Sequence, residues 1–315
     1  MVLDVLLFLV GLALLYYGAE WLVRGSANVA MAMGVTPMVV GLTVVAFGTS
    51  APEVVASLVA VMNGSPDIAL GNVIGSNIAN VGLVLACGAL LYPLKILRST
   101  RVVELPFMVG FTVLLLIFCI DGLISRVDGG ILLACVIGFT IYCLMYTKKG
   151  EEDEKAMEDE VQGIVKDDGN LAKELLITVV GIAGVVLGAY FLVGSATNIA
   201  RAFGVSELVI GVTIVAVGTS LPELATTAIA SIRKQADIAV GNIIGSNIFN
   251  IGLVLGVTSL VEPLAVLREI LTNELVIMAV FSAALIPLTI KLSVGRVAGG
   301  ALLICYAVFL WRMVA

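Results

Sequence analysis

The chain has 315 residues, of which 60% are hydrophobic and 13% charged, with a net charge of −6 and a mean hydropathy of +1.15. A water-soluble domain carries about a quarter charged residues and somewhat under half apolar ones. This composition excludes a water-soluble globular protein, because lipid must solvate most of the surface of so apolar a chain.

Apolar runs between polar or Gly/Pro interruptions are the main feature along the chain. A helix that crosses a bilayer needs about 20 apolar residues, and about ten runs meet this requirement. No segment alternates polar and apolar residues as a membrane β-strand would. The first run contains Asp4 and continues past Leu15, so we do not expect a cleavable signal peptide there. The prediction is an all-α polytopic membrane protein with spans at 3–32, 37–62, 67–92, 102–120, 128–147, 171–202, 207–231, 237–261, 268–290 and 296–314.

An acidic segment separates the fifth span from the sixth. Nine acidic side chains lie between Glu151 and Asp168. We expect a solvated linker over 148–170 that joins a first five-helix repeat, 1–147, to a second, 171–315. A cation-sensing loop is the alternative, but the segment lacks the D-x-[DN]-x-[DN]-G pattern of an EF-hand.

Cysteine and histidine usage limits the chemistry further. The chain has no histidine, which removes the usual transition-metal ligand and the usual near-neutral proton carrier. All the cysteines lie inside apolar spans, so we interpret them as small core residues and not as disulfides or metal ligands. They are Cys87, Cys119, Cys135, Cys143 and Cys305.

Basic residues give the orientation. Ten spans place both termini on one side, and most Lys and Arg residues fall in the loops after spans three, five, seven and nine. The positive-inside rule therefore predicts a cell-membrane protein with both termini extracellular and the acidic linker cytoplasmic. Because five spans is an odd number, the second half must be inserted upside down relative to the first. The opposite side carries only Arg126, Arg201, Arg268 and Arg312.

The two halves share sequence. Residues 41–53 match residues 211–223, and residues 67–80 match residues 237–250, always 170 positions apart (223 − 53 = 170). The match covers spans one to three and six to eight, whereas spans four and five resemble nine and ten only in hydropathy. Inverted repeats place substrate sites near the membrane midplane, where the halves meet, and allow alternating access around that site.

The motif Gly-Thr-Ser-x-Pro-Glu lies in the middle of spans two and seven and ends at Glu53 and Glu223. An ionised carboxylate at this depth costs roughly 2.5–3.5 kcal/mol, so each glutamate needs a compensating partner. Pro52 and Pro222 cannot donate a backbone hydrogen bond. We therefore expect each helix to break at Gly-Thr-Ser and to leave carbonyls around 46–49 and 216–219 unpaired, which is tolerable only where backbone lines a cavity or binds something.

Carbonyl, hydroxyl and carboxylate oxygens together form the environment that hard cations prefer, and calcium accepts six to eight oxygens. The repeated Gly-Asn-x-x-Gly-Ser-Asn-x-x-Asn segments of spans three and eight add further oxygens on one helix face. Gly71, Gly75, Gly241 and Gly245 are expected to let helices approach closely. Glu20, Glu104 and Glu274 have no comparably repeated companions, and we interpret them as interface, cavity-rim or packing groups. The added oxygens belong to Ser76, Asn80, Ser246 and Asn250.

At these residues the chain closely resembles the cation/calcium antiporter superfamily and, within it, the prokaryotic sodium/calcium exchangers. The resemblance is carried by Gly48–Glu53, Gly218–Glu223, Gly75–Asn77 and Gly245–Asn247, which match the two α-repeats of the family. It implies that Glu53 and Glu223 are central ligands shared by calcium and sodium, and that Asn80 joins the central site. It also implies flanking or outer ligands at Thr49, Ser50, Thr219, Ser220, Ser76 and Ser246, and at the backbone carbonyls of Ala46 and Ala216.

Asn250 departs from part of this family, because several relatives carry Asp at the matching position. The resemblance implies that a neutral residue disfavours a potassium requirement. It also leaves the site with two carboxylates in place of three.

The predicted function is a secondary antiporter in which sodium flux drives calcium transport by alternating access. Proton/calcium exchange by the same fold is the first alternative, because two buried glutamates can carry protons. A cation channel is disfavoured, since a complete twofold site lies within one chain. An intramembrane hydrolase is disfavoured by the absence of histidine and of an HExxH motif, so we expect no enzyme. We expect the lipid bilayer, Ca²⁺ and Na⁺ as partners, with no cofactor, no nucleic acid and no obligate protein partner.

Overall fold

The computed structural model describes residues 2–146, 170–204, 218–267 and 273–314. Eight helical stretches in these residues have the length and composition to cross a membrane. Two shorter apolar helices, Leu221–Ile232 and Glu274–Leu288, begin shortly after stretches that the structure does not describe. These ten stretches correspond to the ten predicted spans, except that residues 207–217 of the seventh span and 268–272 of the ninth lie outside the described residues, and the all-helical prediction is confirmed. The acidic stretch from Lys148 to Asp168 lies outside the described residues.

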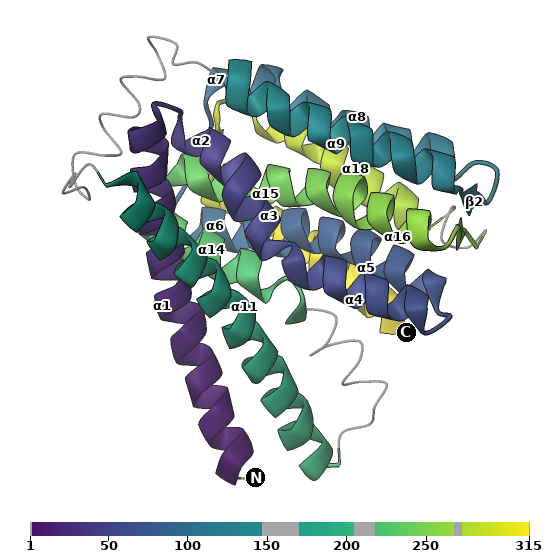
Figure 1. Ribbon diagram of the computed structural model, residues 1–315, viewed down its shortest axis with the longest axis horizontal. Coiled ribbons are helices and arrows are strands. Elements are labelled where there is room, and N and C mark those ends of the chain that lie inside the picture. The colour runs from purple at the N-terminus through teal and green to yellow at the C-terminus, as the bar shows by residue number, and fades with distance from the viewer. Residues whose placement is uncertain (1, 147–169, 205–217, 268–272, 315) are drawn as a thin grey trace.

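The first half contains the elements of spans one to five (Figure 1). They are α1 (Val2–Met33), α2 (Pro37–Val40), η1 (Gly41–Val45), α3 (Ala46–Thr49), α4 (Ala51–Met62), α5 (Pro66–Ala79), η2 (Asn80–Leu85), α6 (Ala86–Leu91), β1 (Leu94–Lys95), α7 (Arg98–Val102), α8 (Glu104–Phe118), β2 (Leu123–Ile124) and α9 (Arg126–Tyr146).

The second half contains the equivalent elements wherever it is described. They are α11 (Leu171–Ala202), α14 (Leu221–Ile232), α15 (Ala236–Phe249), η4 (Asn250–Leu255), α16 (Gly256–Val261), β3 (Leu264–Ala265), α18 (Glu274–Leu288), β4 (Ser293–Val294) and α19 (Arg296–Val314).

Proline and glycine set several of these boundaries. Pro37 and Pro66 occupy the first position of α2 and α5, where the missing N–H has no intrahelical partner to lose. Gly34 and Gly204 follow α1 and α11 with φ of 68° and 79°. Glycine takes this left-handed conformation without the steric cost of a side chain, so both first helices end in the same way.

Four two-residue strands were not expected from the hydropathy pattern. β1 pairs with β4 through Leu94 and Val294, and β2 pairs with β3 through Leu264 and Ile124, both antiparallel. Each ribbon thus joins one loop from each half. Adding 170 to Leu94 gives Leu264, and adding 170 to Ile124 gives Val294. The β1–β4 ribbon and the β2–β3 ribbon are therefore equivalent structures related by the repeat.

The same spacing extends to the last two spans of each half. α8 and α18 begin at Glu104 and Glu274, and α9 and α19 begin at Arg126 and Arg296. Thr112 donates a hydrogen bond to its own counterpart, Ser282, at 3.4 Å. These spans therefore belong to the structural repeat, although their sequences match only in hydropathy.

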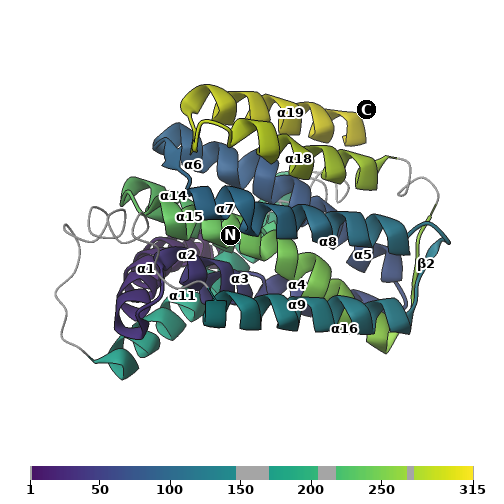
Figure 2. The same ribbon diagram turned by 90° about the horizontal axis from the view of Figure 1, so that it is seen from above.

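Helices α1 and α11 form an antiparallel pair that leans away from the remaining helices (Figures 1 and 2). Glycines bring the two backbones together, since a Cβ at Gly18 would lie 2.6 Å from the Val185 nitrogen. Each end of the pair carries an amide–carboxylate hydrogen bond. Asn28 donates to Glu174 at 2.7 Å, and the equivalent Asn198 donates to Asp4 at 3.1 Å.

The first helix also contacts the helix that begins at Leu221. Glu20, in the middle of α1, forms an ion pair with Arg233 at the end of α14. This contact confirms the interpretation of Glu20 as an interface group. The equivalent positions carry Tyr190 and Asn63, so the ion pair is specific to one side of the repeat.

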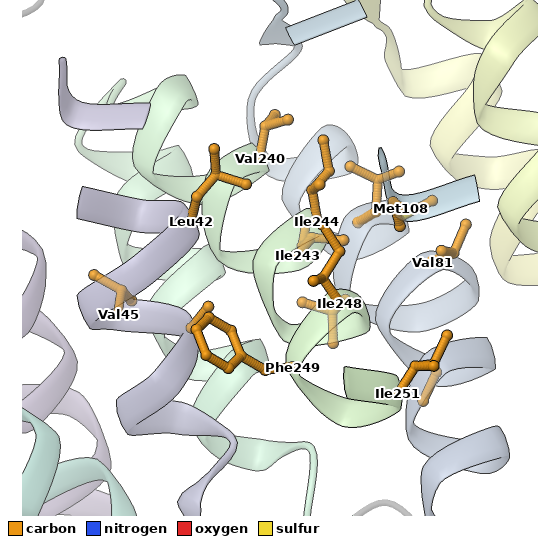
Figure 3. Close-up of a cluster of buried hydrophobic side chains, with 14 of the residues drawn as sticks. Leu42, Val45, Val81, Met108, Val240, Ile243, Ile244, Ile248, Phe249 and Ile251 are labelled. Atoms are coloured by element: carbon orange, nitrogen blue, oxygen red, sulfur yellow. The ribbon is translucent and has the colours of Figure 1, made fainter. Parts of the chain in front are cut away.

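Helix α15 lies in the middle of the helix bundle (Figure 1), and Figure 3 shows the buried side chains around it. Every one of its residues is buried. Its apolar side chains pack against η1, η2 and α8. The central cluster includes Leu42, Val45, Val81, Met108, Ile243, Ile244, Ile248 and Phe249.

Two of the five cysteines differ from the sequence prediction. Cys119 and Cys143 are buried, as expected for core residues, but Cys135 and Cys305 are exposed. They lie at equivalent positions of α9 and α19, on faces that the bilayer covers. Because lipid is as apolar as a protein core, hydropathy alone does not distinguish the two environments.

Candidate cation site

Both repeated glutamates lie at the first turn of a helix, directly after an interruption. Ser50 separates α3 from α4 with φ −82° and ψ 2°, and Ser220 precedes α14 with φ −86° and ψ 6°. Pro52 and Pro222 occupy the start of the helix that follows. The predicted break at Gly-Thr-Ser is therefore confirmed, and it places Glu53 and Glu223 at helix N-termini, where the helix dipole favours negative charge.

The backbone carbonyls are less free than predicted. The Ala46 carbonyl accepts the Ser50 amide at 3.0 Å and the Thr49 hydroxyl at 3.4 Å. The break occurs at a single residue, so the turn before it keeps its hydrogen bond. A carbonyl oxygen has two lone pairs, and both are engaged here, so a cation at the Ala46 carbonyl would compete with the longer bond from Thr49.

Glu223 receives hydroxyl groups from both halves of the chain. Its carboxylate is fully buried. One oxygen, Oε1, accepts hydrogen bonds from Ser50 Oγ and from Ser246 Oγ, each at 3.4 Å. Its other oxygen, Oε2, has no hydrogen-bond partner among the described residues. Ser50 lies in the interruption of the other half, so the two motifs meet at this carboxylate.

Glu53 is also fully buried, and neither of its oxygens has a hydrogen-bond partner in the described part of the chain. Its carboxylate faces Ser76, which is the counterpart of Ser246, and it interacts electrostatically with Glu223. Two neighbouring carboxylates in the middle of a membrane protein, with three of their four oxygens unpartnered among the described residues, need a positive counter-charge from a bound cation or a proton.

The repeated asparagines differ between the halves. Asn80 and Asn250 are the first residues of the π-helical segments η2 and η4, a type of helix distortion that occurs frequently at functional sites. Asn250 donates to Asn77 Oδ1 at 3.1 Å, which leaves its Oδ1 unpaired. Both polar atoms of the buried Asn80 side chain lack partners among the described residues.

Asn72 and Asn242, the first asparagines of the repeated segments, have roles that the sequence analysis did not assign. Asn242 Oδ1 accepts the Thr49 hydroxyl at 3.0 Å, and its amide donates to Thr227 at 3.2 Å. The equivalent Asn72 donates to Ser57 at 3.0 Å. The signal in the sequence that could have identified these two asparagines is their spacing of 170 residues, which is the spacing of the repeat.

Three predicted ligands of the second half lie in or next to the residues that the structure does not describe. Ala216 lies outside the described residues. Thr219 is half-buried, and the buried Ser220 hydroxyl has no partner among the described residues. Gly241 and Gly245 lie against the backbone of Met38 and Leu42, as expected for close approach. A Cβ at Gly71 or Gly75 would meet no described atom within 4 Å.

The arrangement is a set of oxygen donors around two carboxylates. Within the described ranges, no Lys or Arg hydrogen-bonds to either glutamate, and no group of three His, Cys, Asp or Glu side chains converges. Carboxylate, hydroxyl and amide oxygens suit hard cations such as Ca²⁺ and Na⁺, and they do not suit soft transition metals.

Comparison with known proteins agrees with this chemistry. The profile of the family described as "Sodium/calcium exchanger protein" matches residues 3–145 and 173–315. The chain belongs to this family. It is 32% identical to the sodium/calcium exchanger MaX1 of Methanosarcina acetivorans over 98% of this chain and 97% of that one. It is 38% identical to the inner membrane protein YrbG of Escherichia coli over 84% of this chain and 81% of that one.

A solved exchanger has the same fold. The structure of the sodium-calcium exchanger NCX_Mj soaked with zero Na⁺ and Ca²⁺ matches with a TM-score of 0.87 and 33% identity, over 99% of each chain. This member of the sodium/calcium exchanger family is therefore a multi-pass membrane transporter that exchanges cations including calcium, and not an enzyme.

Proposed function

We propose that the chain exchanges Na⁺ for Ca²⁺, with Glu53 and Glu223 as the shared ligands. The observation that carries the proposal is a hydrogen bond across the halves: Ser50, three residues before the buried Glu53 at the break of the first half, donates to the buried Glu223 at the break of the second half. The hydroxyls and amides around them complete an oxygen site. A relative of similar length, MaX1, is named as a sodium/calcium exchanger.

Charge balance gives the physical basis for exchange. Two carboxylates neutralise one Ca²⁺, or two Na⁺ with any further Na⁺ held by neutral oxygens. Because both ions use the same ligands, binding of one excludes the other. A buried site with unbalanced charge is costly in the low-dielectric interior of the membrane. The protein is therefore expected to switch between its outward-open and inward-open states only when cations neutralise the site.

The remaining site assignments belong to the same proposal. We infer that Thr49, Ser50, Thr219, Ser220, Ser76 and Ser246 supply flanking oxygens, that Asn80 and Asn250 supply amide oxygens, and that Ala46 and Ala216 contribute carbonyls. The Thr49, Ser50 and Ser246 hydroxyls support this directly through their hydrogen bonds in the network around Glu223.

We further propose the division into repeats 1–147 and 171–315 with a cytoplasmic linker over 148–170, and extracellular termini. The two ribbons support the topology, because each joins loops that the alternation of ten spans assigns to one side. The basic residues near β1 and β4 support a cytoplasmic location for that ribbon.

The test is calcium-45 uptake into liposomes that contain the purified protein and internal sodium. After dilution into sodium-free buffer, wild-type protein is expected to accumulate calcium. Glu53→Ala and Glu223→Ala are expected to lose uptake almost completely. Glu262→Ala, which removes an exposed glutamate outside the site, serves as the matched control and is expected to retain uptake.

Separate arms distinguish the counter-ion. Uptake that follows an imposed proton gradient without sodium would keep the fold and the calcium site but would replace sodium by protons. Calcium entry without any counter-ion gradient would indicate a channel. Internal potassium in place of sodium is expected to support no uptake.

A further inference from the structure

An open groove of about 590 Å³ lies between α8 and α9, away from the cation site. Its volume falls within the roughly 300–1,000 Å³ of typical small-molecule sites. The two helices lie on the upper side of the bundle in Figure 1. The lining is almost wholly apolar and includes Val102, Phe107, Gly110, Cys135, Gly138 and Tyr142.

Aromatic rings and glycines give the groove its shape. Phe107 contacts Phe139 and Tyr142 with ring centroids 5.2 and 5.5 Å apart, which forms a wall across the two helices. A Cβ added to Gly110 or Gly138 would meet no described atom within 4 Å. The missing side chains of these two glycines therefore create the depth of the groove.

In the described part of the second half, two valines stand where the groove has its glycines. The positions equivalent to Gly110 and Gly138 are Val280 and Val308, whose side chains are largely exposed on α18 and α19. The aromatic wall is also absent there, because Phe107 and Tyr142 correspond to Ile277 and Arg312, although the exposed Cys135 and Cys305 are equivalent. The groove is thus a feature of the first half and does not follow from the symmetry of the fold.

Its surroundings indicate the occupant. The groove lies within the fourth and fifth spans, where the surrounding medium is lipid, and an unfilled groove would forfeit dispersion contacts. At the end near Val102, Arg98 is exposed one helical turn earlier on α7 and so lies on the same face. Lys95 is exposed beside it, and both residues fall on the side that the positive-inside rule assigns to the cytoplasm.

We propose that this groove is a binding site for one anionic phospholipid of the cytoplasmic leaflet. One acyl chain lies over Gly110 and Gly138, between the aromatic wall and Cys135. The phosphate lies near Arg98. Attraction of an anionic lipid by one basic residue at the membrane surface corresponds to about a fivefold change in affinity.

Native mass spectrometry of the full chain tests the proposal, with palmitoyl-oleoyl phosphatidylglycerol and the matching phosphatidylcholine as probes. The double variant Gly110→Val/Gly138→Val, which copies the second half, is expected to weaken phosphatidylglycerol binding at least tenfold. Gly130→Val has open space around its Cβ on the same helix and is expected to bind as wild type. Arg98→Ala is expected to lose about fivefold for phosphatidylglycerol only, whereas Arg126→Ala, at the other end of the span, is expected to lose nothing.

A second measurement needs no variant. A phosphatidylglycerol with a photoreactive acyl chain is expected to cross-link wild-type protein at peptides that contain Gly110 or Cys135, and not at the equivalent peptides around Val280 or Cys305. Equal lipid binding by wild type and the double valine variant, or cross-links distributed equally over both halves, would overturn the proposal. A shift from dimer to monomer in that variant without a change in lipid binding would also overturn it, because the occupant would then be a second copy.

Discussion

At the scale of single residues, neutral side chains orient the carboxylates and decide how the two halves of the site differ. Asn242 links Thr49 of one half to Thr227 of the other through two hydrogen bonds. Its replacement by alanine leaves both buried hydroxyls with one bond fewer, and each lost bond costs about 0.5–1.5 kcal/mol. We expect Asn242→Ala to raise the KM for calcium uptake about tenfold.

Asn72→Ala is the matched control for that change. Among the described residues, Asn72 hydrogen-bonds to Ser57 of its own half and to no residue of the other half, so we expect the KM of Asn72→Ala to rise less than threefold. Equal effects of the two substitutions would show that the link to Thr49 does not orient the site. Thermal unfolding of both variants in detergent separates a local effect from loss of the fold.

Asn250 tests the charge of the site. Asn250→Asp removes the donor to Asn77 and adds a third buried carboxylate to the proposed set of ligands. An extra negative charge at this depth requires an extra cation. We expect the Hill coefficient for sodium in calcium–sodium competition to rise above the wild-type value, whereas Asn250→Ser leaves it unchanged. An unchanged coefficient in Asn250→Asp would place this residue outside the ion-binding region.

At the scale of elements, the pairing of α1 with α11 depends on glycine. A Cβ at Gly18 would lie 2.6 Å from Val185 N and 2.7 Å from Gly184 C, and these backbone atoms cannot rotate away. Overpacking of this kind costs about 1–3 kcal/mol. We expect Gly18→Val to lower the thermal midpoint in detergent and Gly130→Val to leave it close to wild type. If the two variants have the same lowered thermal midpoint, the loss of stability comes from the helix propensity of valine and not from the contact between the helices.

Elements also show where sequence reasoning succeeds and where it stops. Hydropathy predicted all ten spans, and the Pro-Glu motif predicted the breaks at Ser50 and Ser220 because both depend on local chemistry. The π-helical segments that begin at Asn80 and Asn250, and the strand pairing of Leu94 with Val294, depend on contacts between distant segments. No local pattern contains that information.

The cation site shows the same limit. Glu53 and Glu223 were predictable because the motif occurs twice, and an isolated charge in a span needs an explanation. The partner of Thr49 was not predictable, since Asn242 is 193 positions away and its role depends on how α15 crosses α3. The lipid-facing position of Cys135 was missed because a membrane protein is apolar on both sides of each helix.

At the scale of the whole molecule, the two halves are equivalent in fold and unequal in detail. The ribbons, the end contacts of α1 with α11 and the helix starts all follow the 170-residue spacing. The Glu20–Arg233 ion pair and the groove at Gly110 do not. A symmetric fold permits the site to open to either side, whereas asymmetric contacts set the relative stability of the two states.

The orientation of this asymmetric molecule in the membrane is itself testable. Asn63 and Glu262 are exposed in loops that the basic-residue count assigns to the outside, and Lys95 and Lys291 are exposed in loops assigned to the inside. In a background without the five native cysteines, we introduce one cysteine at each position and treat intact cells with a membrane-impermeant maleimide. We expect Asn63→Cys and Glu262→Cys to react in intact cells, and Lys95→Cys and Lys291→Cys to react only after permeabilisation.

The four positions together separate topology from orientation. Lys95 and Lys291 come from opposite halves and lie beside the β1–β4 ribbon, so both must react from the same side if the ten spans are correct. Opposite behaviour of these two would contradict the inverted repeat. A complete reversal of all four would keep the fold but place the ribbon, the Glu20–Arg233 ion pair and Arg98 on the extracellular side. The proposed lipid would then belong to the outer leaflet, which the phospholipid cross-linking experiment would detect in vesicles with an asymmetric lipid composition.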